Sequence, residues 1–403
     1  MSTSGPLLSQ RLTRPLLFLL ATGAAVSVAN LYYNQPLLLL IGHTFHQSAS
    51  HMGLISMATQ AGYAVGLFIF TPLGDVWPRR KLIIWLCLAC AVSLFGLATS
   101  HTLWEVAGFS FVTGVCAVTP QILLPLTADL ADDNRRGQAV GTVMSGLLLG
   151  VLAARTVSGL AATWIGWRGV YIAAGILMLA LAVLMRLALP ALPAKSRARY
   201  LTLVGTMWHL WRSEPLLRQS SAIGAALFGA FSVLWTVLAF RLDAPPYHMN
   251  SAAVGLFGIA GIAGVLGSPI TGRLADKRGP YFMVGVGIIA TLLAFVILWS
   301  VSSAIVGLII GIFLMDFGVQ TGQVSNQARI YALAPEMRSR INSVFMVCYF
   351  LGGAIGSAVG STAYDHFGWT GACATAVFLI ACALTVHLLR RPAPRTRELE
   401  QSV

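Results

Sequence analysis

Runs of apolar residues, each about twenty residues long, follow one another along almost the whole 403-residue chain. A helix needs about 20 apolar residues to cross the hydrocarbon core of a bilayer, whereas a membrane-spanning strand would alternate apolar and polar residues. The composition agrees, because 57% of the residues are hydrophobic and only 10% are charged, against about a quarter charged in soluble proteins. The sequence therefore predicts an all-α integral membrane protein.

Breakers and charged residues divide the chain into twelve predicted spans, six on each side of a polar stretch. The spans are 15–41, 52–74, 82–100, 103–128, 138–162 and 168–189, then 219–240, 250–272, 281–300, 303–328, 341–364 and 369–389. We predict an N-terminal six-helix bundle over 1–190, a cytoplasmic linker over 191–218, a C-terminal six-helix bundle over 219–390 and a cytoplasmic tail over 391–403. In the linker, Leu201, Val204, Trp208 and Trp211 share one helical face, which predicts an amphipathic helix in the membrane interface.

The basic residues concentrate in every second predicted loop, and loops rich in Lys and Arg face the cytoplasm. With the N-terminus inside, 23 of the 26 basic residues fall on the cytoplasmic side, whereas Arg168 and Arg241 fall outside and Arg155 lies within a span. We therefore expect a multi-pass protein of the bacterial inner membrane with both termini in the cytoplasm. The net charge of +13 then reflects topology and contact with membrane lipid, so no nucleic-acid partner is expected.

Cysteine and histidine do not form a convincing redox or metal pattern. The six cysteines fall in predicted spans, and Cys87 and Cys90 are better explained as small buried side chains than as a metal or redox pair. His43, His46 and His51 cluster in a predicted external loop, where a solvated loop is a simpler interpretation than a metal site. No disulfide, metal or cofactor is predicted. The first apolar run lacks a signal-peptide cleavage site, so we expect it to remain as the first helix.

The two halves of the chain repeat one another at a spacing near two hundred residues. Asp75 recurs as Asp276 at an offset of 201, Gly166-Trp167 recurs as Gly368-Trp369 at 202, and Gln121 recurs as Gln323 at 202. Such an internal repeat predicts two pseudo-symmetric six-helix bundles with a binding site between them.

Asp316 is a carboxylate in the middle of a predicted span. Gln320, Gln323 and Gln327 follow it on the same helical face, at steps of four, three and four residues. Ionised groups are costly in lipid and occur there mainly where they line a pathway or form a pair. The pattern predicts a wet cavity beside this helix, with Asp316 as a proton-coupling residue.

Arg155 is the one basic residue deep within a predicted span. It is a second candidate for proton coupling, because it could offset Asp316 or bind an anionic substrate. The alternatives are a structural ion pair and a side chain that reaches the outer membrane interface.

Polar and aromatic side chains at similar depth complete a predicted substrate cavity. Its members are Asn30, Tyr33, Asn34, Gln60, Tyr63, Gln121, Trp235, Gln320 and Gln323. An apolar site with a few amides, hydroxyls and aromatic rings fits a small, mostly uncharged organic ligand. For each residue alone, a hydrogen bond between helices is an equally good interpretation.

Acidic and basic residues recur together after the second and eighth spans and predict a cytoplasmic gate. Its members are Asp75, Arg79, Arg80, Gly272, Asp276, Lys277 and Gly279. A carboxylate here can pair with Arg and accept hydrogen bonds from a helix N-terminus of the other half, which would hold the inner mouth shut. The alternative is that these charges only follow the topology rule.

The segment Gly272-Arg273-Leu274-Ala275-Asp276-Lys277-Arg278-Gly279 resembles a loop motif of the major facilitator superfamily. The first copy keeps Asp75 and the basic pair but departs from the motif at Thr71, Val76 and Pro78. The resemblance covers nearly the whole chain, since the twelve spans and the repeat also match. It implies two six-helix bundles that rock around a central cavity.

A glycine ladder in the fifth span, Gly146, Gly150 and Gly159, allows close helix packing. Gly146, Gly150 and Ala154 resemble a motif of the antiporter branch of the superfamily, except that Ala154 stands where that motif has its third glycine and Arg155 where it has proline. The segment Asn30-Leu31-Tyr32-Tyr33-Asn34-Gln35-Pro36 is similar to bacterial efflux permeases for drugs, sugars and nucleosides. These resemblances imply an exporter.

We therefore predict a transporter, working as a monomer, that exports small organic molecules in exchange for protons. A proton-coupled or facilitative importer on the same fold is the nearest alternative, and a lipid flippase or a sensor that does not transport is more distant. An enzyme is not expected, because no Ser-His-Asp set, metal cluster or phosphate-binding glycine loop appears in the predicted loops.

Overall fold

The computed structural model describes residues 12–190, 199–261, 271–275, 277–301, 303–333 and 337–389. These residues are almost entirely helical, and they contain no strand. The helices are α1 (Arg14–Ala29), α2 (Asn34–Phe45), α3 (Ala49–Val76), α4 (Arg79–Thr99), α5 (Leu103–Cys116), α6 (Thr119–Leu130), α7 (Arg136–Ala188), α8 (Tyr200–Ser213), α9 (Pro215–Asp243), α10 (Ser251–Phe257), α12 (Pro280–Ser300), α13 (Ile305–Tyr331) and α14 (Arg338–Leu389), with short 3-10 turns at Asp133–Arg135 and Gly258–Gly261.

Within the described residues, nine helical segments are long and apolar enough to cross a membrane. Two of them, α7 and α14, contain a sharp turn at Gly166 (φ 67°) and Gly368 (φ 60°), so each holds two spans. A positive φ strains any residue with a Cβ, which explains why glycine recurs at these repeat-related positions. The predicted all-α membrane fold is confirmed. The remaining predicted span, 250–272, is described only at 250–261 and 271–272.

Two predicted spans that we expected to be continuous helices are interrupted. The span 15–41 breaks at residues 30–33, between α1 and α2, and the span 103–128 breaks after Cys116, between α5 and α6. Proline lacks the N–H that would bond to the carbonyl four residues earlier, and its ring clashes with that carbonyl. Pro36 places this defect at Tyr32, within the break at residues 30–33, and Pro120 places it at Cys116, the last residue of α5.

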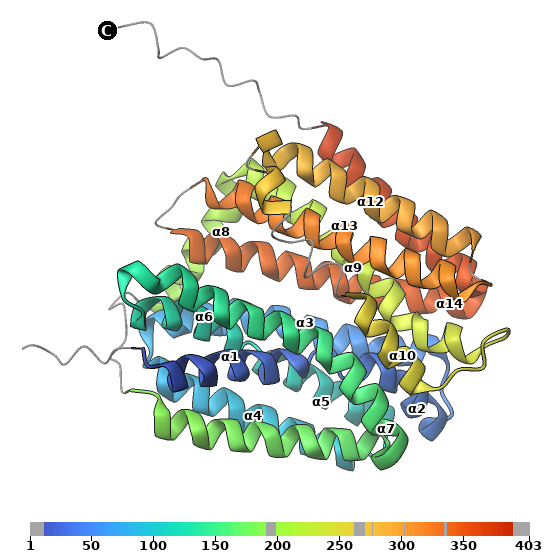
Figure 1. Cartoon of the computed structure of the whole chain (residues 1–403), viewed down its shortest axis with the longest axis horizontal. Coiled ribbons are helices and arrows are strands. Elements are labelled where there is room, and N and C mark those ends of the chain that lie inside the picture. The colour runs from blue at the N-terminus through green and yellow to red at the C-terminus, as the bar shows by residue number, and fades with distance from the viewer. Residues whose placement is uncertain are drawn as a thin grey trace, which may run out of the picture.

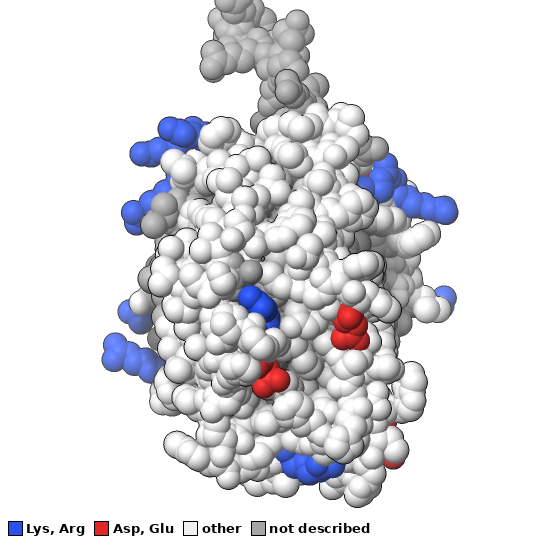
Figure 2. Space-filling view, turned by 90° about the vertical axis from the view of Figure 1, so that its right-hand side faces the viewer, with Lys and Arg blue, Asp and Glu red and all other residues white. Residues whose placement is uncertain are grey.

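The helices form two layers that are stacked on one another. Figure 1 shows the N-terminal helices, from blue α1 to green α7, in one layer and the C-terminal helices, from α9 to red α14, in the other. Within the second layer α9 packs against α14 and α12 against α13; between the layers α3 packs against α14 and α7 against α10. We call the end of the molecule at α8 the basic end, because Arg212, Arg218 and Arg340 lie there, and we call the end at α10 the far end. Figure 2 looks onto the far end, where the charged side chains are scattered over a mostly uncharged face and do not form one continuous patch.

Close packing inside the N-terminal layer depends on glycines of α7. A Cβ added at Gly146 would lie 2.4 Å from the carbonyl oxygen of Ala21, and one at Gly150 would lie 2.3 Å from that of Ala25. Both contacts are with the backbone of α1, which cannot move aside as a flexible side chain could. These glycines therefore allow α1 and α7 to touch along their backbones.

Helix α8 lies at the basic end, where it contacts α3, α9 and α14. It buries Leu203, Met207 and Leu210 and leaves Leu201 and Trp208 exposed. The hydroxyl of Tyr200 donates to the carbonyl oxygen of Ile69 at 3.2 Å, which ties the start of this helix to α3. The part of the predicted linker from 191 to 198 and the predicted tail over 391–403 lie outside the described residues.

All six cysteines are free thiols in the structure. In the part of the chain that is described, no group of three or more His, Cys, Asp or Glu side chains is arranged to hold a metal ion.

Candidate functional site

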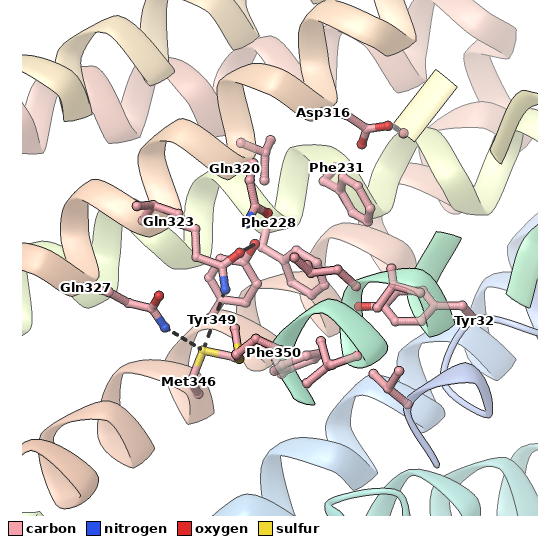
Figure 3. Close-up of a pocket in the computed structure, with 18 of the residues that line it drawn as sticks. Tyr32, Phe228, Phe231, Asp316, Gln320, Gln323, Gln327, Met346, Tyr349 and Phe350 are labelled. Atoms are coloured by element: carbon pink, nitrogen blue, oxygen red, sulfur yellow. Dashed lines mark hydrogen bonds between the residues drawn. The ribbon is translucent and has the colours of Figure 1, made fainter. Parts of the chain in front are cut away.

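A cavity of about 420 Å³ lies between the two layers of helices (Figure 3). The N-terminal layer contributes side chains from α1, α3, α6 and α7, and the C-terminal layer contributes α9, α13 and α14. Aliphatic and aromatic side chains make up most of the wall, and the aromatic ones are Tyr32, Tyr63, Phe228, Phe231, Tyr331, Tyr349 and Phe350. An apolar cavity of this size with a few polar groups has the properties of a site for a small organic ligand.

One face of α13 supplies most of the polar wall. Asp316, Gln320, Gln323 and Gln327 all line the cavity, and Tyr331 continues the row to the basic end. At a rise of 1.5 Å per residue this row is about 22 Å long, so the cavity extends from mid-helix to the basic end of α13. Figure 3 shows Asp316 at one end of the row and Gln327 at the other.

The amides of this row are held by α14. The hydroxyl of Tyr349 donates to Gln323 Oε1 at 3.2 Å, and Gln327 Nε2 donates to Asn342 Oδ1 at 3.1 Å. Gln121 on the opposite layer donates to the hydroxyl of Tyr63 at 3.4 Å. These polar side chains are thus hydrogen-bonded within their own layer. The space between the layers is left for a ligand.

Asp316 is buried, with 6% of its surface exposed, and it still lines the cavity. Its Oδ2 atom has no hydrogen-bond partner. The described residues contain no basic side chain within 4.0 Å of this carboxyl group, so Asp316 and Arg155 do not form a direct ion pair. A buried carboxyl group that faces a cavity and has no basic partner among the described residues is well placed to exchange a proton.

Arg155 lies at the closed end of the same cavity, on α7. Its Nε donates to Gln35 Oε1 at 2.5 Å, and its guanidinium carbon lies 4.8 Å from the ring centroid of Tyr32 and 4.0 Å from that of Trp235. Tyr32 belongs to the N-terminal layer and Trp235 to the C-terminal layer, so the cation joins the two layers through its ring contacts. The Nη2 atom has no hydrogen-bond partner.

The two layers touch closely at the far end. A Cβ at Gly159 would lie 2.5 Å from the carbonyl oxygen of Ser251, and the hydroxyl of Thr156 donates to the carbonyl oxygen of Gly255 at 2.9 Å. The backbone N–H of Ser50 donates to Asp365 Oδ2 at 2.9 Å, which joins α3 to α14. Among the described residues these contacts close the far end, whereas the cavity continues toward the basic end.

The structure places five of the predicted cavity residues behind the wall. Asn30 donates to the backbone of its own helix, Asn34 donates to Thr59, and Gln60 bonds to Ser232 and Ser357 across the two layers. Tyr33 and Trp235 are buried and do not line the cavity. The other four, Tyr63, Gln121, Gln320 and Gln323, do line it.

The wall also contains residues that sequence reasoning missed. Tyr32 faces the cavity in place of Tyr33, because the helix break at residues 30–33 changes which side chains share a face. Pro36 was the available signal for that break. Phe228, Phe231 and Phe350 carried no signal, since a phenylalanine that faces a cavity and one that faces lipid look alike in the sequence.

Arg79 organises the predicted cytoplasmic gate. It is buried, and it bonds to Asp129 Oδ2 at 2.7 Å, to Asp75 Oδ1 at 3.4 Å and to the carbonyl oxygen of Gly74 at 3.0 Å. All of these partners belong to the N-terminal layer, so the bonds stabilise that layer internally. Asp75 also borders a small pocket with Ser339, Arg340 and Ser343 of α14, which is the side on which a contact between the layers would form.

The other predicted gate residues are less connected. Arg80 donates to the carbonyl oxygen of Arg186, also in the N-terminal layer. Asp276 lies outside the described residues. Lys277 is exposed, Gly272 has open space around it, and Gly279 has a φ of 86° at the turn that precedes α12.

Replacing Arg79 with Met should lower the thermal stability of the protein. The substitution removes the cation between Asp75 and Asp129, whose side chains are about one-third exposed, so we expect a loss of about 1–3 kcal/mol rather than the full cost of breaking a buried pair. Thermal unfolding of purified protein in detergent measures this loss. Lys81→Met, on an exposed side chain of the same helix, is the matched control and should unfold like the parent protein.

Arg329 occupies a comparable place in the C-terminal layer. It is buried near the end of α13, where it donates to Gln219 Oε1 at 2.8 Å and to Asn326 Oδ1 at 3.4 Å, and its guanidinium carbon lies 5.3 Å from the ring centroid of Tyr281. Sequence reasoning placed Arg329 in a loop because the predicted span ended at 328, whereas α13 continues to Tyr331.

Comparisons with known proteins agree with this architecture. A family model described as Major Facilitator Superfamily matches residues 20–306 and 244–402. The chain is 39% identical over 365 residues to the putative uncharacterized transporter YgaY of Escherichia coli K12, covering 91% of this chain and 93% of the relative. It is 33% identical over 390 residues to the probable transporter SCO4007 of Streptomyces coelicolor, covering 96% and 90%.

A solved structure shows the same fold at low sequence identity. The bacterial homolog of the human lysosomal transporter Spinster, in an inward-facing and occupied conformation, matches with a TM-score of 0.72 and 12% identity, covering 93% of this chain and 95% of that one.

Proposed function

The chain belongs to the major facilitator superfamily of membrane transporters, and from this premise we propose that it exports small organic molecules in exchange for protons by alternating access. The observation that carries the proposal is the position of Asp316. Its carboxyl group lines the cavity between the two layers and has no basic partner in the described residues. A proton and a ligand can therefore meet at one site.

The proposed cycle follows from which end of the cavity is closed. With the basic end in the cytoplasm, as the distribution of Lys and Arg predicts, the conformation described here receives a ligand from the cytoplasm. Separation of α7 from α10 and of α3 from α14 would then open the far end to the outside. There Asp316 takes up a proton, the ligand leaves, and the proton is released to the cytoplasm after the layers return.

The remaining predictions about the cellular context are part of this proposal. We place the protein in the bacterial inner membrane as a monomer, with both termini in the cytoplasm and with small molecules, protons and membrane lipid as its partners. The gate at the basic end would close when Asp75 meets the start of α14, since Asp75 already borders Ser339 and Ser343.

Flux measurements in liposomes test the proposal. Ligands are first found by a thermal-shift screen on the purified protein, and liposomes containing the protein are then loaded with a labelled ligand. Acidifying the outside should speed release of the ligand and acidify the interior. A pH gradient without effect on release would indicate a facilitator, and uptake driven by external acid would indicate an importer; either result contradicts the proposal.

A further inference from the structure

We infer that the closed end of the cavity is a head-group subsite, where Arg155 and Asp316 together bind a ligand group that carries a hydrogen-bond acceptor next to a donor and has no net charge. Carboxamides and zwitterionic amino acids have such head groups. The inference rests on the proposed function, since it names the substrate class of the same cavity.

Two unpartnered polar atoms that belong to the cavity wall define the subsite. Arg155 Nη2 is a donor, Asp316 Oδ2 is an acceptor, and each belongs to a side chain that is more than nine-tenths buried and lines the cavity. Buried polar atoms are nearly always hydrogen-bonded, so two unpaired ones at one end of a cavity indicate a missing partner. A ligand group that both accepts and donates would satisfy them together.

The surroundings prevent the two side chains from satisfying each other. Arg155 is held by Gln35 and by the rings of Tyr32 and Trp235, and no ion pair to Asp316 within 4.0 Å forms. A Cβ added at Gly261 would lie only 3.1 Å from Asp316 Oδ2, so glycine leaves free the space beside the carboxylate. The gap between the fixed charges is therefore available to a ligand.

The opposite charges of Arg155 and Asp316 set the preferred charge of the head group. An anionic head group would be attracted to Arg155 and repelled by Asp316, and a cationic head group would be attracted to Asp316 and repelled by Arg155. A neutral amide or a zwitterion can bind to both side chains. Because the site is buried, each mismatched charge would also lose its hydration without a full replacement. The subsite therefore disfavours a net charge of either sign.

A row of aromatic rings continues from the subsite and would contact the apolar body of the ligand. Phe231 lies beside Arg155, Phe228 stacks on Phe231 with centroids 5.2 Å apart, and Tyr349 stacks on Phe228 with centroids 4.1 Å apart. Figure 3 shows Phe231 near Asp316 and the row leading toward Gln323. The expected ligand thus has an uncharged or zwitterionic head and an apolar, preferably aromatic, body.

Four probes with the same phenylethyl body test the inference by binding alone. They are 3-phenylpropanamide, L-phenylalanine, 3-phenylpropanoate and 2-phenylethylamine, titrated calorimetrically into the full chain in nanodiscs at pH 7.5 without a pH gradient. The amide and the zwitterion should bind at least about tenfold more tightly than the anion and the amine, a difference of about 1.4 kcal/mol. Equal affinities, tightest binding of the anion or the amine, or no binding of any probe would overturn the inference.

Two substitutions should reverse the preference in opposite directions. Asp316→Asn leaves Arg155 as the one charge of the subsite and should raise the affinity for the anion at the expense of the amine. Arg155→Gln leaves Asp316 as the one charge of the subsite and should raise the affinity for the amine at the expense of the anion. Asp132→Asn, on an exposed residue outside the cavity, is the control and should keep the parent order. A purely structural role would weaken all four probes equally and would contradict the inference.

The binding experiment and the flux experiment test the two proposals independently. If the probes discriminate by head group but flux does not respond to pH, the proton coupling is wrong and the subsite stands. If flux responds to pH but head groups are not discriminated, the subsite is wrong and the proposed function stands.

Discussion

Replacing Asp316 with Asn should abolish proton-driven release of a ligand from liposomes while the protein remains folded. Asparagine has nearly the same shape as aspartate but cannot ionise, so the variant has no group at this position that takes up and releases a proton. We expect the rate of gradient-driven release to fall by at least about tenfold, which corresponds to an increase of about 1.4 kcal/mol in the activation free energy of transport. Exchange of labelled for unlabelled ligand without a gradient should continue, because the cavity wall is retained.

The same liposomes provide the controls for this variant. Asp132→Asn removes an exposed carboxylate outside the cavity and should transport like the parent protein. Thermal unfolding of Asp316→Asn should show a folded protein, since the substitution keeps the shape of the side chain and breaks no ion pair among the described residues. Unchanged gradient-driven release in Asp316→Asn would remove Asp316 from the proton pathway.

Replacing Gly159 with Leu should shift the protein away from the conformation that is closed at the far end. A Cβ at this position lies 2.5 Å from the carbonyl oxygen of Ser251 and 2.9 Å from Gly255 Cα, so any larger side chain pushes α7 away from α10. Overpacking of this kind costs about 1–3 kcal/mol, which shifts an equilibrium between two conformations by about 5–150-fold. Transport should fall accordingly, because the cycle requires both conformations.

Electron spin resonance distances detect this shift directly. Spin labels at Trp164 on α7 and Leu256 on α10, both exposed, should move apart in the Gly159→Leu variant. Gly141→Leu is the matched control: it is on the same helix, and a Cβ there meets nothing within 4 Å. Gly159→Ala should give an intermediate distance. An unchanged distance with normal transport would show that this crossing is not the far-end closure.

The features that could be predicted from the sequence depend on local pattern. The polar row after Asp316 was predicted because its spacing places the side chains on one face of a helix that is otherwise apolar, and a face of that kind has to avoid lipid. The repeat of Gly166 at Gly368 was likewise visible, since only glycine tolerates the backbone of that turn without strain. Both inferences rest on the sequence of single segments and do not require knowing which helices pack against them.

The features that could not be predicted depend on which helices meet. Asn30 and Gln60 have the same amide chemistry as Gln323, but neighbouring backbone and hydroxyl groups bind them outside the cavity wall. Arg155 was recognised as the one basic residue deep within a predicted span, yet its contacts with Gln35 and Trp235 require α2, α7 and α9 to come together. Polar residues in a membrane can be satisfied by a helix, by a neighbouring helix or by water in a cavity, and sequence alone does not distinguish these partners.

The sequence by itself determined that this protein is a bundle of membrane-crossing helices in two related halves, because the bilayer forces every backbone polar group to be satisfied within its own helix and so reduces the choice to span length and apolar pattern. Only the tertiary structure decided which polar groups share the cavity, that Asp316 and Arg155 face it without pairing, and that the far end is the closed one. These outcomes depend on contacts between segments that are far apart in the sequence. The close approach of Gly159 to the backbone of Ser251 and Gly255 is one such contact, and it helps to close the far end.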